Sequence, residues 1–587
     1  MRSLNCLLRT LACGIFLLLL NGTVLAQFNA GVQGSVKDSS GALVSEALVT
    51  LTNRQTNQTQ QVTASDEGFY RFSALPPGEY SLKAEKPGFE ATTLNITVRA
   101  ESLQGFDIVL NVAGAAATVT ITDIGEQVLQ TENANVDKVI TNQEVLRLPQ
   151  VGRDPYELAR LAPGVFGAGA RSANGDSSGL PNTSGPGASN VGIFATENRP
   201  PISANGQRVS ANNYQIDGVS VNSQTWGGAA VVTPTQESVK EVQVTSGTYS
   251  ATDGRNSGAL VKVVTQNGTN DFHGSAFFKY NTPAWNAFNK GFTIPGTTRG
   301  VTPARVENRD KTFGGSLGGP ILQDKLFFFF AYEGLRNSAN DTFEAFIDTP
   351  EFRQLIRTAR PNSIAASIVS QSGVEPRVVS VLNRSCSDFN FPAPTPNGVP
   401  KCQLVAGGFD IGSPALALGQ YVPLNDTFGL GGGFDGIPDV QFALLEAPRS
   451  TKGNQYVTRL DFNATDKDRF AFTLFYVPAE LFGADRAAQS RPMADIRSDR
   501  LNWNTAFTYI RTFSPTVINE ARFNITKWGF NEVDANPDVN FGIPRVEIES
   551  FLPTDRLRYG ANRSENTPGI IGERQIDFRD IVTWFRG

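Results

Sequence analysis

The residues most suggestive of chemistry are a serine set among glycines and the single histidine of the chain. Gly314-Gly315-Ser316-Leu317-Gly318 has the G-x-S-x-G spacing that presents a nucleophilic serine in many hydrolases. That motif requires a turn from a strand into a helix and a histidine that acts as general base. His273 is the only histidine, and no acidic partner for it is evident downstream. We therefore expect no enzyme activity and no cofactor.

Two further motifs could bind ligands, and both are incomplete. The glycine-rich run Gly429–Gly436 lacks the Lys-Ser/Thr pair and the strand–helix context of a phosphate-binding loop. Asp435 and Asp439 resemble part of a calcium loop, but two carboxylates fall short of the roughly 6–8 oxygen ligands that calcium takes. The sequence thus predicts no metal site, with Asp435 and Asp439 as the calcium alternative.

The first 26 residues have the features of a signal peptide. Arg2 and Arg9 precede an apolar run, Leu11–Leu20, and small residues lead to a predicted cleavage between Ala26 and Gln27. The apolar run is too short to cross a bilayer, which takes about 20 residues, and no later stretch is long enough for a transmembrane helix. If the protein spans a membrane, it does so as a barrel.

Export would leave two cysteines, Cys386 and Cys402, in an oxidising compartment. They lie close in sequence, within a region rich in Pro and Asn. We predict a disulfide that closes a loop. Two free thiols are the alternative, because sequence alone does not show that the two Cβ atoms approach each other.

The composition excludes some partners and favours β-structure. The formal net charge is -5 over 587 residues, and no run of Lys or Arg stands out, so nucleic acid is not expected as a partner. The chain has 40 Phe, 56 Gly and 33 Pro, as expected of short strands separated by turns.

After the signal peptide, residues 27–112 read as a small β-sandwich. Short apolar segments separated by turn residues predict strands at 32–36, 47–52, 60–64, 69–72, 78–84, 93–98 and 106–110. Phe69, Phe72 and Tyr80 are the predicted core aromatics. The motifs Asp66–Phe72 and Leu75–Tyr80 resemble those of carboxypeptidase-regulatory-like domains. The resemblance implies a prealbumin-like or Ig-like sandwich related to carbohydrate-binding modules, without peptidase activity.

A linker, residues 113–123, follows the sandwich. It is rich in Ala, Thr and Val and reads as extended chain. The segment Thr118-Val119-Thr120-Ile121-Thr122 is the candidate for a box that pairs, as an added strand, with a periplasmic energy-coupling protein. A simple linker strand, or the first strand of the next domain, is the alternative.

Residues 124–268 alternate short helical and strand signals, which predicts an α+β domain. Helices are expected at Asn142–Leu148 and Asp154–Leu161, and Asp217-Gly218 is expected to form a hairpin turn because Gly tolerates positive φ. Five motifs lie, in order along the chain, at 148–154, 161–165, 205–208, 216–219 and 249–258. They resemble the plug of Oar-like TonB-dependent outer-membrane receptors. The motif residues carried over are Asn205, Gly206, Arg208, Asp217, Gly218 and Arg255.

Residues 269–587 change to long amphipathic strands. We predict strands at 272–281, 309–318, 326–336, 454–463, 468–477, 501–511 and 516–528, each about the length of a tilted membrane strand. In the fourth, Tyr456 and Phe462 belong to an apolar face that alternates with Arg459 and Asp461. One face suits lipid and the other a wet lumen.

The connections between these strands alternate in length, as they do in outer-membrane barrels. The short links are 319–325, 464–467 and 512–515, and the long links are 282–308, 337–453 and 478–500. Motifs at 270–275, 314–321 and 324–334 also match the Oar-like family. The fold class predicted is therefore mainly β: a sandwich, an α+β plug and an incomplete antiparallel transmembrane barrel.

The barrel reads as a fragment. A plug of about 145 residues has a radius of gyration near 15 Å, whereas a barrel of about 8 strands has room only for its own side chains. Plugged transporters need about 22 strands. We therefore expect an open sheet with an unpaired edge.

The family resemblance implies a location and a function. It places the protein in the outer membrane of a Gram-negative bacterium, in contact with its lipid, with the sandwich in the periplasm. There the protein would take up an unidentified solute, a carbohydrate or a chelate, using energy from a TonB-type coupling protein. Surface adhesion through carbohydrate binding, and protein export or sorting, are the alternatives.

Overall fold

The computed structural model describes most of the chain. The residues described are 30–99, 103–112, 122–123, 135–148, 153–167, 192–225, 227–247, 249, 257–285, 307–359, 361–389, 402–411, 436–514, 516–536, 546–548, 556–560 and 569–584. Several predictions fall outside these residues: the cleavage site at Ala26 and Gln27, the box positions from Thr118 to Ile121, Arg255 and Asp435. Those stay predictions.

The N-terminal segment folds into two small sheets around one core. Its strands are β1(Gly31–Asp38), β2(Leu48–Asn53), β3(Thr59–Thr63), β4(Phe69–Ser73), β5(Gly78–Glu85), β6(Thr92–Val98), β7(Leu103–Gly105) and β8(Ile108–Leu110). One sheet has the order β4-β1-β7 with β8 also on β1, and the other has the order β3-β2-β5-β6-β9. The last strand, β9(Thr122–Asp123), runs parallel to β6, so the final residue of the box candidate lies on the edge of this sandwich.

Two details of the predicted sandwich are wrong. Phe69 is 41% exposed, and the core aromatic of this strand is Tyr70, which is 1% exposed. The reason is the period of two along a strand, which places Tyr70 and Phe72 on one face and Phe69 on the other. Of the strand expected at 106–110, only β8 at its end is a strand, and the buried Phe106 lies between β8 and the unpredicted β7.

A second unit, which we call the central body, comprises the described residues from 135 to 268. Its main sheet has the order β10-β15-β16-β13-β14. The strands are β10(Val136–Thr141), β11(Val165–Gly167), β12(Ile202–Ala204), β13(Asn213–Ile216), β14(Val219–Ser220), β15(Val239–Gly247) and β16(Leu260–Thr265). Helix α2(Asn142–Arg147) begins at a capping box in which Thr141 and Glu144 bond each other's backbone. The second predicted helix is a 3-10 helix, η1(Pro155–Leu161), capped by Asp154.

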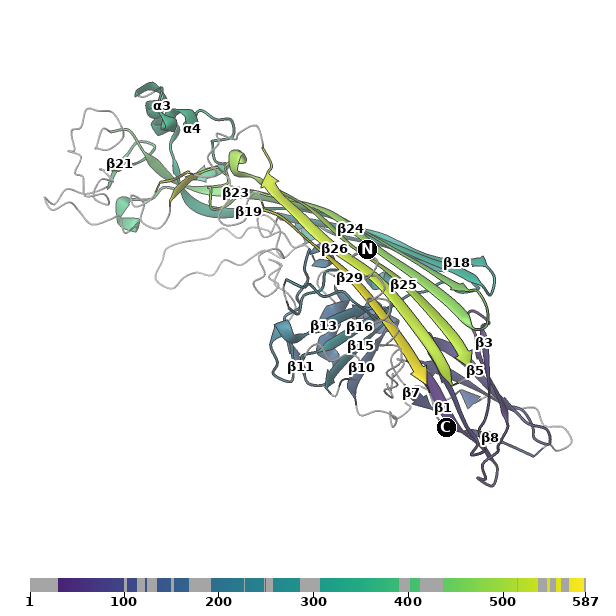
Figure 1. Cartoon of the computed structure of the whole chain (residues 1–587). Helices are drawn as coiled ribbons and strands as arrows, with labels where there is room; N and C mark the ends of the chain where they lie inside the picture. Colours follow the sequence, from purple (N-terminus) through teal and green to yellow (C-terminus); the bar gives the residue numbers. More distant parts are fainter. Residues whose placement is uncertain are drawn as a thin grey trace, which may run out of the picture.

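Long antiparallel strands form one large twisted sheet beside these units (Figure 1). In sheet order they are β17(His273–Asn281), β18(Glu307–Leu322), β19(Leu326–Asp348), β23(Val440–Asn463), β24(Asp468–Gly483), β25(Ile496–Ser514), β26(Val517–Asp534) and β29(Gly569–Trp584). Among the described residues β17 pairs only with β18 and β29 only with β26, so the sheet is open. No helix in the described part of the chain is both long and apolar enough to cross a membrane.

The predicted strands of this sheet lie where expected, but several are too short. β19 continues to Asp348 and β23 begins at Val440, because the two strands stay paired far beyond the predicted limits at 336 and 454. The long link predicted at 337–453 is correspondingly shorter. β29 was not predicted.

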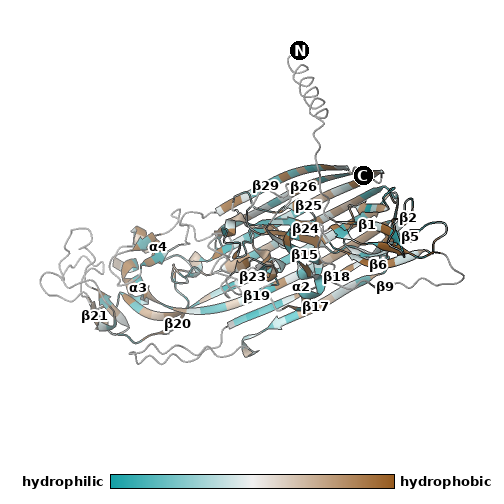
Figure 2. Cartoon of the chain, turned by 90° about the horizontal axis from the view of Figure 1, so that it is seen from below, coloured by the Kyte–Doolittle hydropathy of each residue, from teal (hydrophilic) through white to brown (hydrophobic). Residues whose placement is uncertain are grey.

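The two faces of the sheet differ as the alternation predicts. On β23, Tyr456 is 38% exposed, whereas Val457 is buried against the central body. Apolar and polar residues alternate along these strands in Figure 2. On the outer face, ring contacts join Tyr332, Tyr456 and Tyr476 in one row across three strands, and Phe462, Phe470 and Tyr509 in another.

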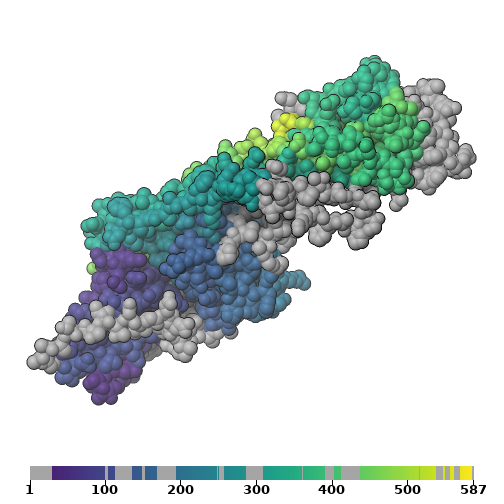
Figure 3. All heavy atoms as spheres, turned by 180° about the vertical axis from the view of Figure 1, so that it is seen from behind, coloured from purple at the N-terminus to yellow at the C-terminus, as the bar shows by residue number. Residues whose placement is uncertain are grey.

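The extension of β19 and β23 carries a third unit, which we call the distal lobe, at the end of the molecule opposite the sandwich (Figure 3). Its elements are α3(Pro350–Ala359), α4(Ile364–Val369), β20(Val378–Val381), β21(Cys402–Val405), β22(Gly408–Ile411), β27(Val546–Ile548) and β28(Leu557–Tyr559). Buried Asp348 accepts hydrogen bonds from Arg491 Nη2 at 2.5 Å and from the Tyr559 hydroxyl at 3.0 Å. The lobe therefore has its own packed and charged interior.

Candidate functional site at the interface of the central body and the sheet

The central body and the large sheet share one hydrophobic core. Valines and aromatic residues of the body pack with side chains from the inward face of four sheet strands, β19, β23, β24 and β26. The sheet contributes Phe329, Ala331, Val457, Phe475, Trp528 and Phe530. Because these residues alternate with outward ones, the sheet can bury one face on the body while the other stays exposed.

Arg153 joins the body to the sheet through buried charges. Its Nε donates to Glu333 Oε1 of β19 at 3.0 Å, and its Nη2 lies 3.4 Å from Glu237 Oε1 of the body. The guanidinium also lies over the Phe277 ring of β17, 4.1 Å from its centroid. Ser275 of β17 donates to Glu237 at 2.6 Å. All three charged side chains are at least nine-tenths buried, so each needs its partners.

Asp217 forms a second junction, at the predicted hairpin turn. Asp217 and Gly218 both have positive φ and connect β13 to β14, which confirms the turn. The carboxylate accepts from the backbone N–H and the hydroxyl of Thr265 within the body. It also accepts from Arg459 Nη1 of β23 at 3.3 Å and from the Thr473 hydroxyl of β24 at 3.1 Å. The turn residue is therefore also a contact with the sheet.

Gly218 permits the closest approach at this junction. Its carbonyl accepts from Arg522 Nη1 of β26 at 2.9 Å, and a Cβ at this position would collide with the Arg522 guanidinium. Glycine suits this position for its φ of 76°, and any side chain here would also have to displace the Arg522 guanidinium.

Amide side chains of the sheet bind backbone carbonyls of the body nearer the distal lobe. Asn502 Nδ2 donates to the Val231 carbonyl at 2.6 Å, and Gln455 Nε2 donates to the Thr233 carbonyl at 2.8 Å. Beside them, the Phe194 ring packs directly against Gly453, where a Cβ would collide with it. The contact between body and sheet thus runs along the strands from the Asp217 turn toward the lobe.

The other carried-over residues that the structure describes do not join this interface. Asn205 and Gly206 form a second positive-φ turn on the exposed surface of the body, where Asn205 Nδ2 donates to the Ser246 carbonyl at 2.5 Å. Arg208 is exposed beside that turn. The sequence motifs therefore correspond to one turn at the interface with the sheet and one turn on the exposed surface of the body.

Sequence reasoning missed the charged partners Glu237, Glu333 and Arg459. A usable signal existed for two of them, since Glu333 and Arg459 are charged residues on strands of membrane length. Charged residues in such segments face the interior and need partners. Glu237 gave no such signal.

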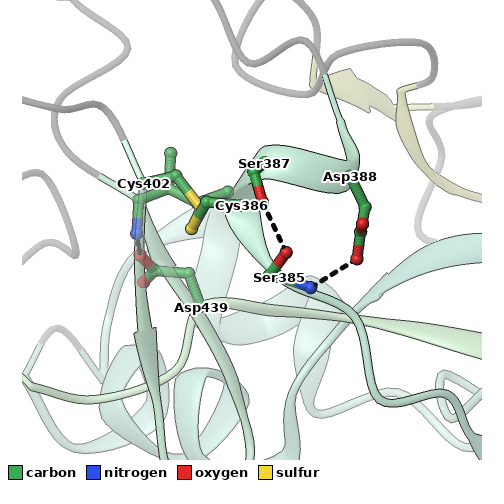
Figure 4. The surroundings of a disulfide bond; sticks show 7 residues. Ser385, Cys386, Ser387, Asp388, Cys402 and Asp439 are labelled. Carbon is green, nitrogen blue, oxygen red and sulfur yellow. Dashed lines mark hydrogen bonds between the residues drawn. A yellow bond between two sulfur atoms is a disulfide. The ribbon is translucent and has the colours of Figure 1, made fainter.

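The remaining candidate residues lie elsewhere. Cys386 and Cys402 form a disulfide in the distal lobe with a Cα–Cα distance of 5.9 Å (Figure 4). Asp439 is buried and accepts from the Ile411 N–H at 2.8 Å, and the described residues contain no group of three or more potential metal ligands. Ser316 lies inside β18, not at a turn into a helix.

Fold and site define a protein with membrane-length antiparallel strands and an α+β body fixed to one face of their sheet. The chain belongs to the outer membrane beta barrel domain family, whose model matches residues 264–587. A carboxypeptidase regulatory-like domain model matches residues 31–111. Membership places the protein in the outer membrane of a Gram-negative bacterium.

Comparison with individual proteins gives one similar sequence and two similar solved structures. The TonB-dependent transporter Oar of Myxococcus xanthus is 30% identical over 345 residues, which cover 56% of this chain and 29% of that protein. Among solved structures, the outer membrane transporter YddB of Escherichia coli is 11% identical with a TM-score of 0.41, covering 77% of this chain and 46% of that one. The ferric enterobactin receptor PfeA of Pseudomonas aeruginosa is 13% identical with a TM-score of 0.33, covering 69% and 42%. The chain thus spans less than half the length of each.

Proposed function

We propose that this protein is part of a TonB-dependent outer-membrane transporter and that the central body is its plug. The observation that carries the proposal is the position of the body, fixed to the inward face of the sheet by a shared core, by a buried ion pair and by a partly buried one. In a barrel closed around it, a unit held in this way blocks the lumen until it is moved. The named relative, a TonB-dependent transporter, supports the same function.

The contacts at Arg153 and Asp217 suit a plug that must keep one position at rest. Buried ion pairs specify a geometry more than they add net stability, because desolvation offsets much of the attraction. Breaking one leaves a charge without its partner in an apolar setting, which is costly. We propose that Arg153–Glu333 and Asp217–Arg459 hold the resting position and that energy from the coupling protein overcomes them.

The coupling protein would act from the side of the sandwich. The sandwich contacts the sheet beside the short link of β18 and β19, where Asn57 Nδ2 donates to Asp324 at 3.0 Å. Short links mark the periplasmic end of outer-membrane barrels. We therefore propose that the sandwich and the box candidate at 118–122 face the periplasm. Adhesion through the sandwich would require the opposite orientation, and bond chemistry is not proposed.

The proposal is tested by uptake in cells. A strain that makes the protein is given radiolabelled glycans or chelates, with and without its energy-coupling protein. We expect uptake that depends on both the protein and the coupling protein. Uptake that continues without the coupling protein contradicts energised transport, and export of a protein substrate by the same strain favours the sorting alternative.

A second measurement does not depend on knowing the solute. Ser238 is fully buried in the body, so a Ser238→Cys variant should react with a maleimide only when the body moves. Labelling in cells should be faster with the coupling protein than without it. Exposed Gln207→Cys is the matched control and should label equally in both strains. Equal labelling of Ser238→Cys in both strains would count against a movable plug.

A further inference from the structure

The sandwich meets the large sheet through a seam of polar contacts. Arg469 Nη2 of β24 donates to the Ala74 carbonyl at 2.6 Å, and the Asn270 N–H donates to the Gln55 carbonyl at 2.9 Å. The hydrophobic core of the sandwich contains only sandwich residues in the described part of the chain. The seam therefore depends on a few hydrogen bonds instead of a shared core.

Two sandwich turns form this seam, and both contain strained residues. Asn57, in the turn between β2 and β3, and Ala74, in the turn between β4 and β5, each have a φ of 56°. A positive φ is uncommon for residues other than glycine, and such strain persists where the surroundings fix it and often where a site is built. The Ala74 turn aims its carbonyl directly at Arg469.

A cavity of about 100 Å³ lies between the two turns and the sheet. Its sheet side consists of cross-strand neighbours, with Arg469 between Asn463 and Ile510. Its sandwich side consists of Asn53, Thr56, Gln58, Pro76 and Pro77. The cavity thus has one wall on the sheet and one on the sandwich, and Asn267 of the central body completes its lining.

Two residues that line this cavity each carry a buried donor with no hydrogen-bond partner in the described part of the chain. The donors are Arg469 Nη1, on a residue that is only 8% exposed, and Gln58 Nε2. The other charges of the lining satisfy each other, since Arg459 and Asp461 form an ion pair at 2.9 Å. Buried donors without an acceptor are costly, so a cavity with two of them is suited to a guest that accepts hydrogen bonds.

We infer that this cavity is a binding site for a small oxyanion, with inorganic phosphate as the probe of that class. Arg469 Nη1 supplies a charged donor, and guanidinium groups match the geometry of phosphate oxygens. Gln58 Nε2 supplies the second donor from the opposite wall. The bound anion bridges the sheet and the sandwich, and it therefore strengthens their contact. The inference does not rest on the proposed function.

Calorimetry of the purified full chain in detergent tests the site. Phosphate is titrated at constant ionic strength, with chloride as the reference titration. We expect saturable binding that weakens at least tenfold in both Arg469→Met and Gln58→Leu. The matched controls are Arg511→Met, an exposed arginine on the neighbouring strand, and Gln61→Leu, an exposed glutamine on β3, and both should bind as the wild type does.

The two test variants distinguish loss of the anion site from loss of the contact between sandwich and sheet. Arg469→Met removes the bond to Ala74 as well as the anion donor, whereas Gln58→Leu leaves the Arg469–Ala74 bond in place. Hydrogen exchange at residues 54–58 reports whether the sandwich stays docked. Loss of phosphate binding in a docked Gln58→Leu variant supports the site. No difference between phosphate and chloride in the wild type, or wild-type binding by Gln58→Leu, overturns it and leaves a cavity filled by water only.

Discussion

The large sheet is in contact with two units, and it holds them by different means. The central body shares a hydrophobic core with the sheet and adds a buried ion pair from Arg153 and a partly buried one from Asp217. The sandwich has a core of its own and touches the sheet through hydrogen bonds around a cavity. Burial of apolar area is the dominant favourable term in association, and hydrogen bonds exchange with water at little net gain. The sandwich is therefore the more easily separated unit.

This difference matters for a transporter. A unit that must be displaced by external energy needs a firm resting position, whereas a unit that receives the coupling protein needs freedom to move aside. The comparison assigns the first role to the central body and the second to the sandwich. Both assignments are proposals, and substitutions at each contact test them.

The largest effect is expected at the buried charges of the body. Glu333→Ala leaves Arg153 without its main partner, and breaking a buried pair from one side costs about 3–5 kcal/mol. The free energy of unfolding, measured by denaturant titration of the protein in detergent, should fall by that amount. Arg497→Ala breaks an exposed pair with Asp499 and should cost less than about 1 kcal/mol. Equal losses in the two variants would show that the Arg153 junction does not anchor the body.

Gly206 and Gly218 have the same φ of 76°. Replacing each by alanine therefore separates the cost of backbone conformation from the cost of a side-chain contact. Gly206→Ala meets no atom within 4 Å and should cost about 1 kcal/mol for its backbone alone. Gly218→Ala bears the same cost and must also displace the Arg522 guanidinium, so its loss of unfolding free energy should be larger. The same denaturant titration measures both. Similar values would mean that Arg522 moves aside freely and that the turn is not a tight junction.

The sequence predicted the strands and turns of the body and the sheet better than the contacts between them. Alternation along β23 placed Tyr456 and Val457 on opposite faces, and the Asp217-Gly218 turn followed from glycine chemistry alone. Such features are local, with periods of two to four residues. The partners of Arg153 lie 84 and 180 residues away along the chain, and no local pattern gives such a pairing.

Errors in the predicted sheet have a similar cause. β19 and β23 were predicted only as far as a membrane requires, but their backbone pairing continues to Asp348 and Val440. In the sandwich, Phe69 was placed in the core because it is aromatic, although its neighbour Tyr70 has the inward register. Residue type alone was a weaker guide than strand register.

A smaller effect is expected at the seam of the sandwich. Asn57→Ala removes the bond to Asp324, which should cost about 0.5–1.5 kcal/mol, and adds the strain of an alanine at a φ of 56°. Hydrogen exchange should become faster in the turn at residues 54–58, while exchange in the central body stays unchanged. Asn95→Ala, on β6 and away from the seam, is the matched control. Faster exchange in the central body of Asn57→Ala would contradict the separation of the two units.

The smallest effect should be confined to the sandwich and should depend on pH. Burial alone would raise the pKa of Asp107, but hydrogen bonds from Lys37 and Ser35 hold the pKa below its usual value. Because the folded pKa is depressed, the stabilisation is present above the unfolded pKa, near 3.8, and is lost as pH falls through the folded pKa. Asp107→Asn should therefore reduce sandwich stability at neutral pH and flatten its acid dependence below about pH 4. Hydrogen exchange across β1 measures this change in stability. Because only a few hydrogen bonds join the sandwich to the sheet, hydrogen exchange in the sheet should stay unchanged.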